Sequence, residues 1–183
     1  MGGAIRVAVP SDAKAIAAIY APFVSDTVVS FEIEPPTPEA MATRIAKTLP
    51  THPWLVAELG GRVVGYAYSG EHRDRAAYRW SVDVTVYVAS DKHRAGLGRS
   101  LYGRLFEILR AQNFRSAFAG ITLPNDASVG LHEALGFKPV GIYREVGFKH
   151  GQWREVGWWR LALSDVPGEP AKPIPFSVLK LNL

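Results

Sequence analysis

The chain has 183 residues, of which 48% are hydrophobic and 11% aromatic, a composition that fits one globular domain with a buried core. It contains no cysteine, which excludes disulfides, thiolate metal sites and a cysteine nucleophile. The net charge of +4 favours an anionic partner, which can be nucleic acid, a membrane surface or a phosphorylated cofactor. The N-terminus lacks the apolar core of a signal peptide and no apolar run is long enough to span a bilayer, so we expect a cytoplasmic protein without membrane contact.

The N-terminal part of the sequence predicts two helices. Residues 10–24 carry apolar side chains at helical spacing, and Ser11 is the expected N-cap. Residues 37–49 show a second helical pattern, with Thr37 as the expected N-cap and Pro38 at the first helical position. The first predicted helix carries Ile16, Ile19, Tyr20 and Phe23 on one face.

Two segments with a strand pattern follow. Residues 54–69 consist of two strand-like runs on either side of Gly60 and Gly61, which is typical of a β-hairpin. Residues 79–88 alternate strictly and predict a strand with one apolar and one polar face. The apolar face carries Val82, Val84, Val86 and Val88, and the opposite face carries Ser81, Asp83, Thr85 and Tyr87.

The next predicted helix begins after a glycine turn. Its apolar stripe consists of Leu97, Leu101, Leu105, Ile108 and Leu109. A strand is expected at residues 116–123, then a loop that contains Asn125, and then a short helix over residues 127–135. Gly136 is the expected left-handed cap of that short helix.

The C-terminal part predicts two more strands and a tail. Strand patterns cover residues 138–146 and 154–163. From residue 164 the prolines imply an extended connector, after which residues 176–183 alternate like one more strand. We therefore expect a domain over residues 1–163 and a proline-rich tail over residues 164–183.

A basic, glycine-containing turn, HRAGLGRS, precedes the leucine-striped helix. Glycines before a helix let a ligand approach the backbone, and the unpaired N–H groups of a first helical turn attract anions. The turn lacks the third glycine of the dinucleotide fingerprint and the lysine of a P-loop. A phosphate site and a solvated basic surface therefore both remain possible. The nearby cations are Arg73, Arg75, Arg79, Lys92, Arg94, Arg99 and Arg104.

In its context this turn resembles a known signature. The segment VYVASDKHRAGLGRSLY resembles the acetyl-CoA site of the GCN5-related N-acetyltransferase (GNAT) superfamily, in which R/Q-x-x-G-x-G/A joins a valine-rich strand to a long helix. LPNDASVGLHEALGFKPVG resembles the next motif of that superfamily, which flanks the pantetheine arm. The resemblance implies acetyl-CoA as acetyl donor, with loop amides around its pyrophosphate. The residues that it assigns to acetyl-CoA are Val86, Tyr87, Val88, Arg94, Ala95, Gly96, Leu97, Gly98, Arg99 and Asn125. His93 is a departure, since Gln or Arg is usual there.

Several further segments narrow the resemblance. VSFEIEPPTPE, HPWLVAE, GYAYSGEHRDRAAYRWSVDVTVYV and VGFKHGQWREVGWW resemble, in this order, the phosphinothricin acetyltransferases. Those enzymes acetylate the α-amino group of glutamate-like herbicides, and close relatives act on methionine sulfoximine or sulfone. The similarity extends from about residue 5 to residue 163. The residues that it implies for the small amino-acid substrate are Phe31, Arg73, Arg75, Tyr78 and Thr85. For Arg73 and Arg75, the alternative to substrate binding is that they lie in an exposed loop.

Two side chains are candidates for proton transfer. Making an amide from a thioester needs a neutral amine and a proton for the departing thiolate. Asp83 is the candidate base, because a carboxylate inside a valine strand is costly unless it is paired or used. The resemblance places a glutamate base at this position, and a structural carboxylate is the alternative. His132 is the candidate auxiliary acid or base, with a packing residue as the alternative.

The resemblance also implies an architecture: an α/β fold with a mixed, mostly antiparallel twisted sheet, helices on both faces, and a splayed gap between two central strands. We expect direct transfer in a ternary complex, and a homodimer in which WREVGWW and the tail contribute to the interface. No histidine–carboxylate spacing resembles a metal site, so no metal is expected. An acetyltransferase for another small amine and an inactive coenzyme A binding module remain alternatives. A nucleic-acid binder is disfavoured, because no recognition-helix or RNA-binding motif is present.

Overall fold

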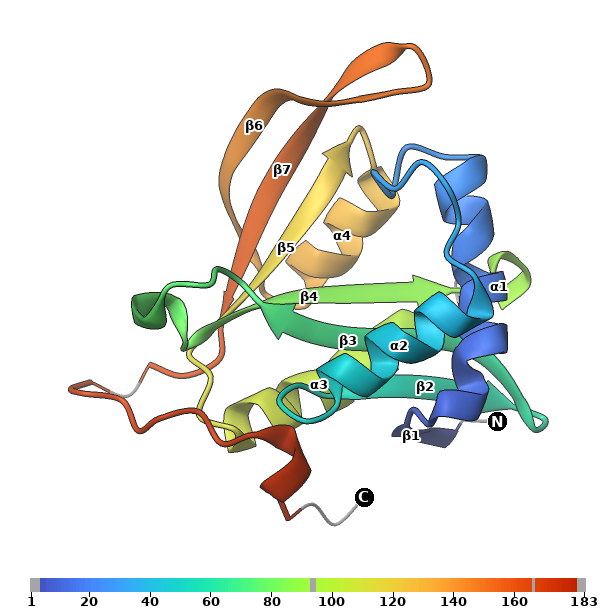
Figure 1. Cartoon of the computed structure of the whole chain (residues 1–183). Coiled ribbons are helices and arrows are strands. Elements are labelled where there is room, and N and C mark those ends of the chain that lie inside the picture. Colours follow the sequence, from blue (N-terminus) through green and yellow to red (C-terminus); the bar gives the residue numbers. More distant parts are fainter. Residues whose placement is uncertain (1–3, 93–94, 166, 181–183) are drawn as a thin grey trace.

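The computed structural model describes residues 4–92, 95–165 and 167–180. In this part of the chain seven strands form one sheet, in the order β1-β2-β3-β4-β5-β7-β6 (Figure 1). Neighbouring strands are antiparallel except β4 and β5, which run parallel. The expected mixed, mostly antiparallel sheet is confirmed. The strands are β1 (Ala4–Val7), β2 (Trp54–Leu59), β3 (Arg62–Glu71), β4 (Ser81–Val88), β5 (Ser116–Leu123), β6 (Lys138–Lys149) and β7 (Gln152–Ala162).

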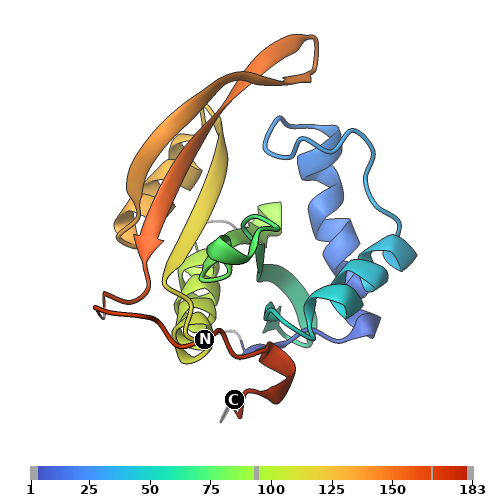
Figure 2. The same cartoon turned by 60° about the vertical axis from the view of Figure 1, so that its left-hand side comes forward.

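Helices cover both faces of the sheet, as expected (Figure 2). On one face Val82 of β4 packs with Leu101 and Leu105 in a core, and on the other face Tyr66 of β3 packs with Ile45 in a second core. The alternating side chains of the central strands therefore supply two separate cores. No helix in the described residues is long and apolar enough to cross a bilayer. The helices are α1 (Ala13–Ser25) and α2 (Pro38–Thr48) on one face, and α3 (Leu97–Ala111) and α4 (Asp126–Ala134) on the other.

The two central strands separate along their length. β4 and β5 pair only where Ser81–Asp83 lies beside Ser116–Phe118. Beyond these residues β4 stays paired with β3, and β5 stays paired with β7 as far as Leu123 (Figure 1). The sheet thus splits into two halves. We call the space between β4 beyond Asp83 and β5 beyond Phe118 the fork, and it confirms the expected splayed gap.

The predicted helix caps are correct for one helix and wrong for another. The hydroxyl of Thr37 accepts a hydrogen bond from the backbone N of Ala40 at 3.2 Å and caps α2, as predicted. The predicted cap at Ser11 is wrong, because this residue lies inside a 3-10 turn that precedes α1. The carboxylate of Asp12 instead accepts a hydrogen bond from the backbone N of Val9 at 2.8 Å.

The tail packs against the domain and does not add a strand. Phe176–Val178 form a 3-10 turn, so the described part of residues 176–183 does not form the strand that alternation predicted. The buried Gln112, at the end of α3, donates from Nε2 to the carbonyl oxygens of Ile174 at 2.7 Å and Thr51 at 2.9 Å. These hydrogen bonds fix the tail across the base of α3. A tail paired as a further strand would leave the buried amide of Gln112 without them.

Candidate active site

The predicted anion turn lies between β4 and α3. Gly96 has a φ of +76°, a left-handed conformation that glycine adopts without strain, and α3 starts at the next residue, Leu97. The amides of residues 97 to 99 occupy the first helical turn, where N–H groups have no acceptor within the helix. Such a turn is suited to bind an anion. The predicted contact Arg94 and the atypical His93 lie outside the described residues.

Gly98 allows a close approach of the backbone to neighbouring elements. A Cβ atom at this position would lie 3.4 Å from Cδ2 of Leu131 on α4 and 4.0 Å from Cγ2 of Val86 on β4. Asn125 caps α4 with its side-chain oxygen, which accepts a hydrogen bond from the backbone N of Ser128 at 3.1 Å. The first turn of α3, strand β4 and the start of α4 therefore meet at one place.

The other predicted cofactor contacts occupy less enclosed positions. Val88 is partly buried and packs against the core that contains α3. Ala95 and Arg99 are exposed at the glycine turn. Their positions leave the backbone of this turn open to solvent.

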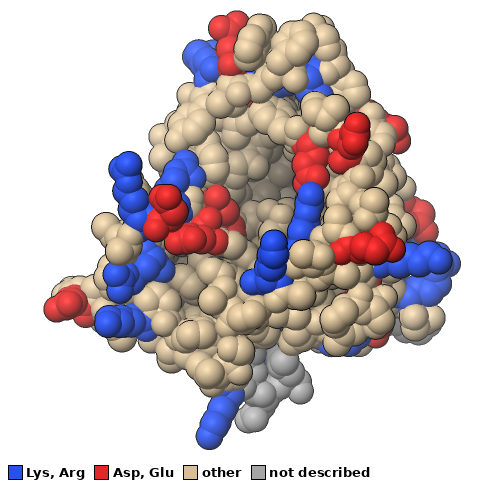
Figure 3. All heavy atoms as spheres, in the orientation of Figure 1, with Lys and Arg blue, Asp and Glu red and all other residues tan. Residues whose placement is uncertain are grey.

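A cavity of about 90 Å³ lies in the fork. The same face of the molecule is visibly hollowed, and charged side chains of both signs surround the hollow (Figure 3). β4, β5, α3 and α4 all contribute to the cavity walls. The predicted residues that the structure brings together there are Thr85, Val86, Tyr87, Asn125 and His132. Among the wall residues that the sequence interpretation did not select is Tyr102, which extends from α3 beside the predicted leucine stripe.

His132 is held in one tautomer by two hydrogen bonds. Its Nδ1 lies 2.7 Å from the carbonyl oxygen of Ser128, which can only accept, so Nδ1 carries the proton. Its Nε2 lies 3.1 Å from the phenol oxygen of Tyr102 and therefore accepts a hydrogen bond from that hydroxyl. Burial lowers the pKa of His132, because a charged imidazole is poorly solvated there. At neutral pH His132 is an uncharged group that can accept a proton.

Asp83 is paired with a histidine that the sequence interpretation did not select. Its Oδ1 lies 2.6 Å from Nδ1 of His72, which follows the end of β3. Burial raises the pKa of the Asp83 carboxyl, and the neighbouring His72 and Arg73 oppose this rise. The signal that could have found His72 is the hairpin register, which pairs Gly70 with Asp83 and so places residue 72 nearby.

The predicted substrate residues of the 70s loop differ in their surroundings. The guanidinium of Arg73 lies 5.8 Å from the ring centroid of Trp158 on β7, over its face. Tyr78 is edge-on to His72 at a centroid distance of 6.1 Å. Arg75 is exposed, and within the described residues its side chain makes no hydrogen bond, ion pair or ring contact. The structure thus brings Arg73 and Tyr78 to one aromatic wall and leaves Arg75 outside it.

Phe31 is positioned by a buried lysine. Nζ of Lys149, at the end of β6, donates to the carbonyl oxygens of Val24 at 2.6 Å, Ser30 at 2.7 Å and Glu32 at 2.9 Å. The Phe31 ring packs on Gly147, where a Cβ atom would lie 2.2 Å from it. The α1–α2 loop is thereby fixed against the β6–β7 hairpin.

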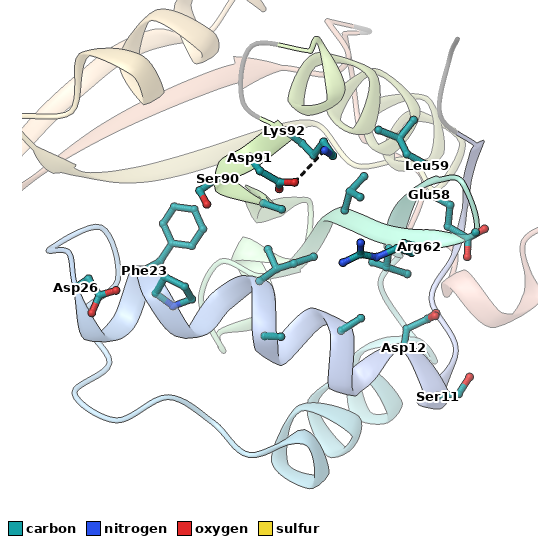
Figure 4. A pocket seen from close by; sticks show the side chains of 18 of the residues that line it. Ser11, Asp12, Phe23, Asp26, Glu58, Leu59, Arg62, Ser90, Asp91 and Lys92 are labelled. Carbon is teal, nitrogen blue, oxygen red and sulfur yellow. Dashed lines mark ion pairs between the residues drawn. The ribbon is translucent and has the colours of Figure 1, made fainter.

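A larger cavity, of about 870 Å³, lies between α1 and the β2–β3 hairpin and contains none of the predicted site residues (Figure 4). Its acidic wall residues Asp12 and Glu58 both bind the guanidinium of Arg6, at 2.7 Å each. Lys92 at its rim is paired with Asp91 at 2.9 Å. These charges are used in internal ion pairs. Within the described residues no cluster of three histidine or acidic side chains could hold a metal ion.

A family comparison agrees with this geometry. Residues 5–158 match the model of the Acetyltransferase (GNAT) domain. The chain is 42% identical over 171 residues to a phosphinothricin N-acetyltransferase of Streptomyces viridochromogenes, which covers 93% of each chain. It is 35% identical over 175 residues to an L-methionine sulfoximine/L-methionine sulfone acetyltransferase of Pseudomonas aeruginosa, which covers 93% of this chain and 100% of the relative.

A solved structure with the same architecture carries a bound ligand. The phosphinothricin acetyltransferase of Sinorhizobium meliloti, solved in complex with AcCoA, superposes with a TM-score of 0.90 at 31% identity and covers 99% of this chain and 100% of that one. Sequence, domain model and fold therefore agree. The chain belongs to the GNAT acetyltransferases, in the branch that contains the phosphinothricin N-acetyltransferases.

Proposed function

We propose that this protein transfers an acetyl group from acetyl-CoA to the α-amino group of a small glutamate-like amino acid, such as phosphinothricin, methionine sulfoximine or methionine sulfone. Acetyl transfer to a small amino acid is supported by relatives that bear these names and cover most of the chain. The observation that carries the proposal is the fork, which has an anion-binding turn at one end and the Asp83–His72 pair at its closed end.

The fork fits acetyl-CoA in shape and charge. The amides that follow Gly96 would hold the pyrophosphate, and the missing side chain of Gly98 leaves room for it beside Val86. The separated edges of β4 and β5 would receive the pantetheine arm, with Tyr87 and Asn125 along the wall. When bound, acetyl-CoA supplies the activated acetyl group. Arg99 and Arg94 would place positive charge beside the phosphates.

The acceptor would lie on the opposite face of β4 from α3. Asp83 and Thr85 share this face, because their neighbours Val82 and Val84 point into the α3 core. Arg73 would bind the carboxylate or the distal acid group of the amino acid. Tyr78 and Phe31 would close the site from the loop before β4 and from the α1–α2 loop. Arg75 would join them by a change of side-chain rotamer, since it is exposed.

The chemical steps divide between two groups of residues. The amine arrives as an ammonium and must lose a proton before it can attack the thioester carbon. The negative charge of the Asp83 carboxylate would stabilise this proton after it has left the amine. His132 is uncharged and hydrogen-bonded to Tyr102, so it would act as an acceptor or as a positioning group and not as a ready acid. Of the two roles expected for His132 from the sequence, auxiliary acid or base, we therefore keep the role of base and not that of acid.

We also propose a homodimer, formed through β6. The sequence interpretation assigned the interface to WREVGWW and the tail. Of that segment Trp153 is exposed but Trp159 is buried in the domain core, and the tail packs on α3. β6 is instead an edge strand with a row of exposed apolar side chains. These are Val140, Ile142, Tyr143, Val146 and Phe148, and Trp153 of β7 is exposed beside them. An unpaired apolar edge of this kind is suited to a second copy of the chain. The cytoplasmic location and the absence of nucleic-acid and membrane partners stay predictions.

Light scattering after gel filtration tests the dimer. The wild-type protein should have twice the monomer mass, and Phe148→Asp should have the monomer mass because it places a charge in the apolar row. Val178→Asp, an equally exposed apolar position on the tail, is the matched control and should remain dimeric. A monomer mass for the wild-type protein at micromolar concentration would contradict the proposed homodimer.

A thiol-release assay tests the proposed reaction. Acetyl-CoA binding is first measured by calorimetric titration, and free thiol is then followed after adding phosphinothricin, methionine sulfoximine, methionine sulfone or glutamate. Turnover with at least one of these and none with N-acetylglutamate supports transfer to the α-amino group. Turnover with only a polyamine would favour the alternative acceptor class, and binding without turnover would favour the inactive coenzyme A module, which the named relatives do not favour.

A further inference from the structure

His72 is surrounded by aromatic side chains. Its imidazole stacks on Phe118 of β5 at a centroid distance of 4.4 Å and an angle of 16°. The ring of Trp158 meets it edge-on at 6.0 Å, and Tyr78 does so at 6.1 Å. Only 13% of the side chain is exposed. Three aromatic rings therefore fix the plane of the imidazole, in the way that a positioned catalytic group requires.

The two ring nitrogens of His72 have different surroundings. Nδ1 lies 2.6 Å from Oδ1 of Asp83 and carries a proton toward that carboxylate. Nε2, on the other side of the ring, has no hydrogen-bond partner in the described chain. This nitrogen is not fully buried, so it reaches solvent. The exposed atom of the imidazole is thus the one with a lone pair available.

The pair lies beside the fork. Asp83 is two residues before Thr85 on the same strand face, and Thr85 lines the fork cavity. Two residues of a strand span about 6.6 Å, roughly the length of a small amino acid backbone. The other charged group next to the pair is Arg73, whose NH1 donates to the carbonyl oxygen of His72 at 2.6 Å. An amino acid whose carboxylate meets Arg73 would present its α-nitrogen near this imidazole.

We propose that His72 is a catalytic residue of the acetyl transfer, in which Nε2 takes the proton from the ammonium group of the acceptor while Asp83 holds Nδ1–H. This inference rests on the proposed function. A carboxylate that accepts a hydrogen bond from an imidazole is a weaker proton acceptor, and the imidazole becomes a stronger one. Asp83 therefore acts through His72 and stabilises the imidazolium that forms.

Nε2 bonds one proton of the ammonium, which leaves a neutral amine with a lone pair. The amine nitrogen forms a bond to the thioester carbon, and the carbon–sulfur bond breaks with its electron pair going to sulfur. The second nitrogen proton passes to the thiolate, and the imidazolium later returns its proton to solvent. One amide, one thiol and one released proton result.

His72→Asn separates proton transfer from a structural role. The Asn side-chain N–H donates toward Asp83 as Nδ1–H does, but the amide cannot take up a proton. We expect kcat to fall about 10²- to 10³-fold while the Kd for acetyl-CoA stays within about twofold. His52→Asn is the matched control, because His52 also stacks on a phenylalanine, Phe114, at 5.5 Å, away from the fork. It should retain wild-type kcat.

A second variant does not depend on how well Asn packs. His72→Ala leaves a gap on Phe118, and added imidazole should restore part of kcat, with a rate that rises with the concentration of neutral imidazole. Turnover of His72→Asn within about threefold of wild type would overturn the role of His72, as would a lack of imidazole rescue in a folded, acetyl-CoA-binding His72→Ala. A wild-type protein without thiol release on any amino acid would overturn the proposed function, and this inference with it.

Discussion

The phenol oxygen of Tyr102 on α3 and Nε2 of His132 on α4 lie 3.1 Å apart at the wall of the fork. Both side chains are buried, so the hydrogen bond is shielded from bulk solvent. Tyr102→Phe leaves a buried acceptor unpaired, and we expect the free energy of unfolding to fall by about 1–3 kcal/mol. Urea unfolding measures this loss. Ser177→Ala removes an exposed hydroxyl of the tail, outside the proposed interface, and should change the stability by less than about 0.5 kcal/mol. Equal stability of the two variants would contradict the hydrogen bond.

Asp83→Asn should separate catalysis from stability. The substitution removes the carboxylate that holds His72, and we expect kcat to fall about 10²-fold or more with little change in acetyl-CoA affinity. Because burial raises the pKa of Asp83, the ionised carboxylate at neutral pH is less favourable in the folded than in the unfolded state. The Tm of Asp83→Asn at pH 7 should therefore equal or exceed that of the wild type. Thermal unfolding and thiol release on the same sample check both, and unchanged turnover would remove Asp83 from the reaction.

Two glycines of α3 offer a matched pair of substitutions. Gly98→Ala places a methyl group at the anion turn, 3.4 Å from Leu131, an ordinary contact that the fold tolerates. Gly103→Ala, one and a half turns later, meets no atom within 4 Å. Both variants should gain up to about 1 kcal/mol of stability from helix propensity. Only Gly98→Ala should weaken acetyl-CoA binding, by about tenfold, in calorimetric titration. Equal affinities would mean that acetyl-CoA does not approach the backbone there.

The pH dependence of stability should report on Asp12. Its bonds to Arg6, and then the amide of Val9, hold the pKa of this carboxyl below its usual range, although burial opposes them. A carboxyl with a lowered folded-state pKa stabilises the fold above its unfolded-state pKa, about 3.9, and this contribution is lost as the pH falls through the folded-state pKa. Asp12→Asn should lower the free energy of unfolding by about 2 kcal/mol at pH 7. The difference from wild type should shrink below about pH 4, and a constant difference from pH 7 to pH 2 would contradict this.

The elements that the sequence predicted well depend on local patterns. The alternation around Val82 and Val84 matches a strand with one face in the α3 core, and the stripe from Leu97 to Leu109 is buried as predicted. Gly136 has the left-handed φ, +93°, expected of a helix cap. In each case the residue and the contact that explains it lie within one or two turns or along one strand. Local sequence is then sufficient.

The features that were missed depend on contacts between distant segments. The pairing of His72 with Asp83 requires the β3–β4 register and a loop that turns the imidazole back onto β5. The position of the tail is set by Gln112, a polar residue whose burial helical periodicity does not indicate. Lys149 was overlooked for the same reason, since its three carbonyl partners lie more than a hundred residues earlier. Long-range hydrogen bonds of this kind have no local signature in the chain.

Mass spectrometry of the reaction product shows whether the acetyl group is transferred to the α-nitrogen. Wild-type protein, acetyl-CoA and phosphinothricin are incubated at neutral pH, and the amino acid is analysed by fragmentation. We predict a product heavier by one acetyl group, with the added mass on the α-nitrogen, and no such product with His72→Asn or Asp83→Asn in the same time. An unchanged amino acid across the glutamate-like panel, with a protein that binds acetyl-CoA, would contradict it.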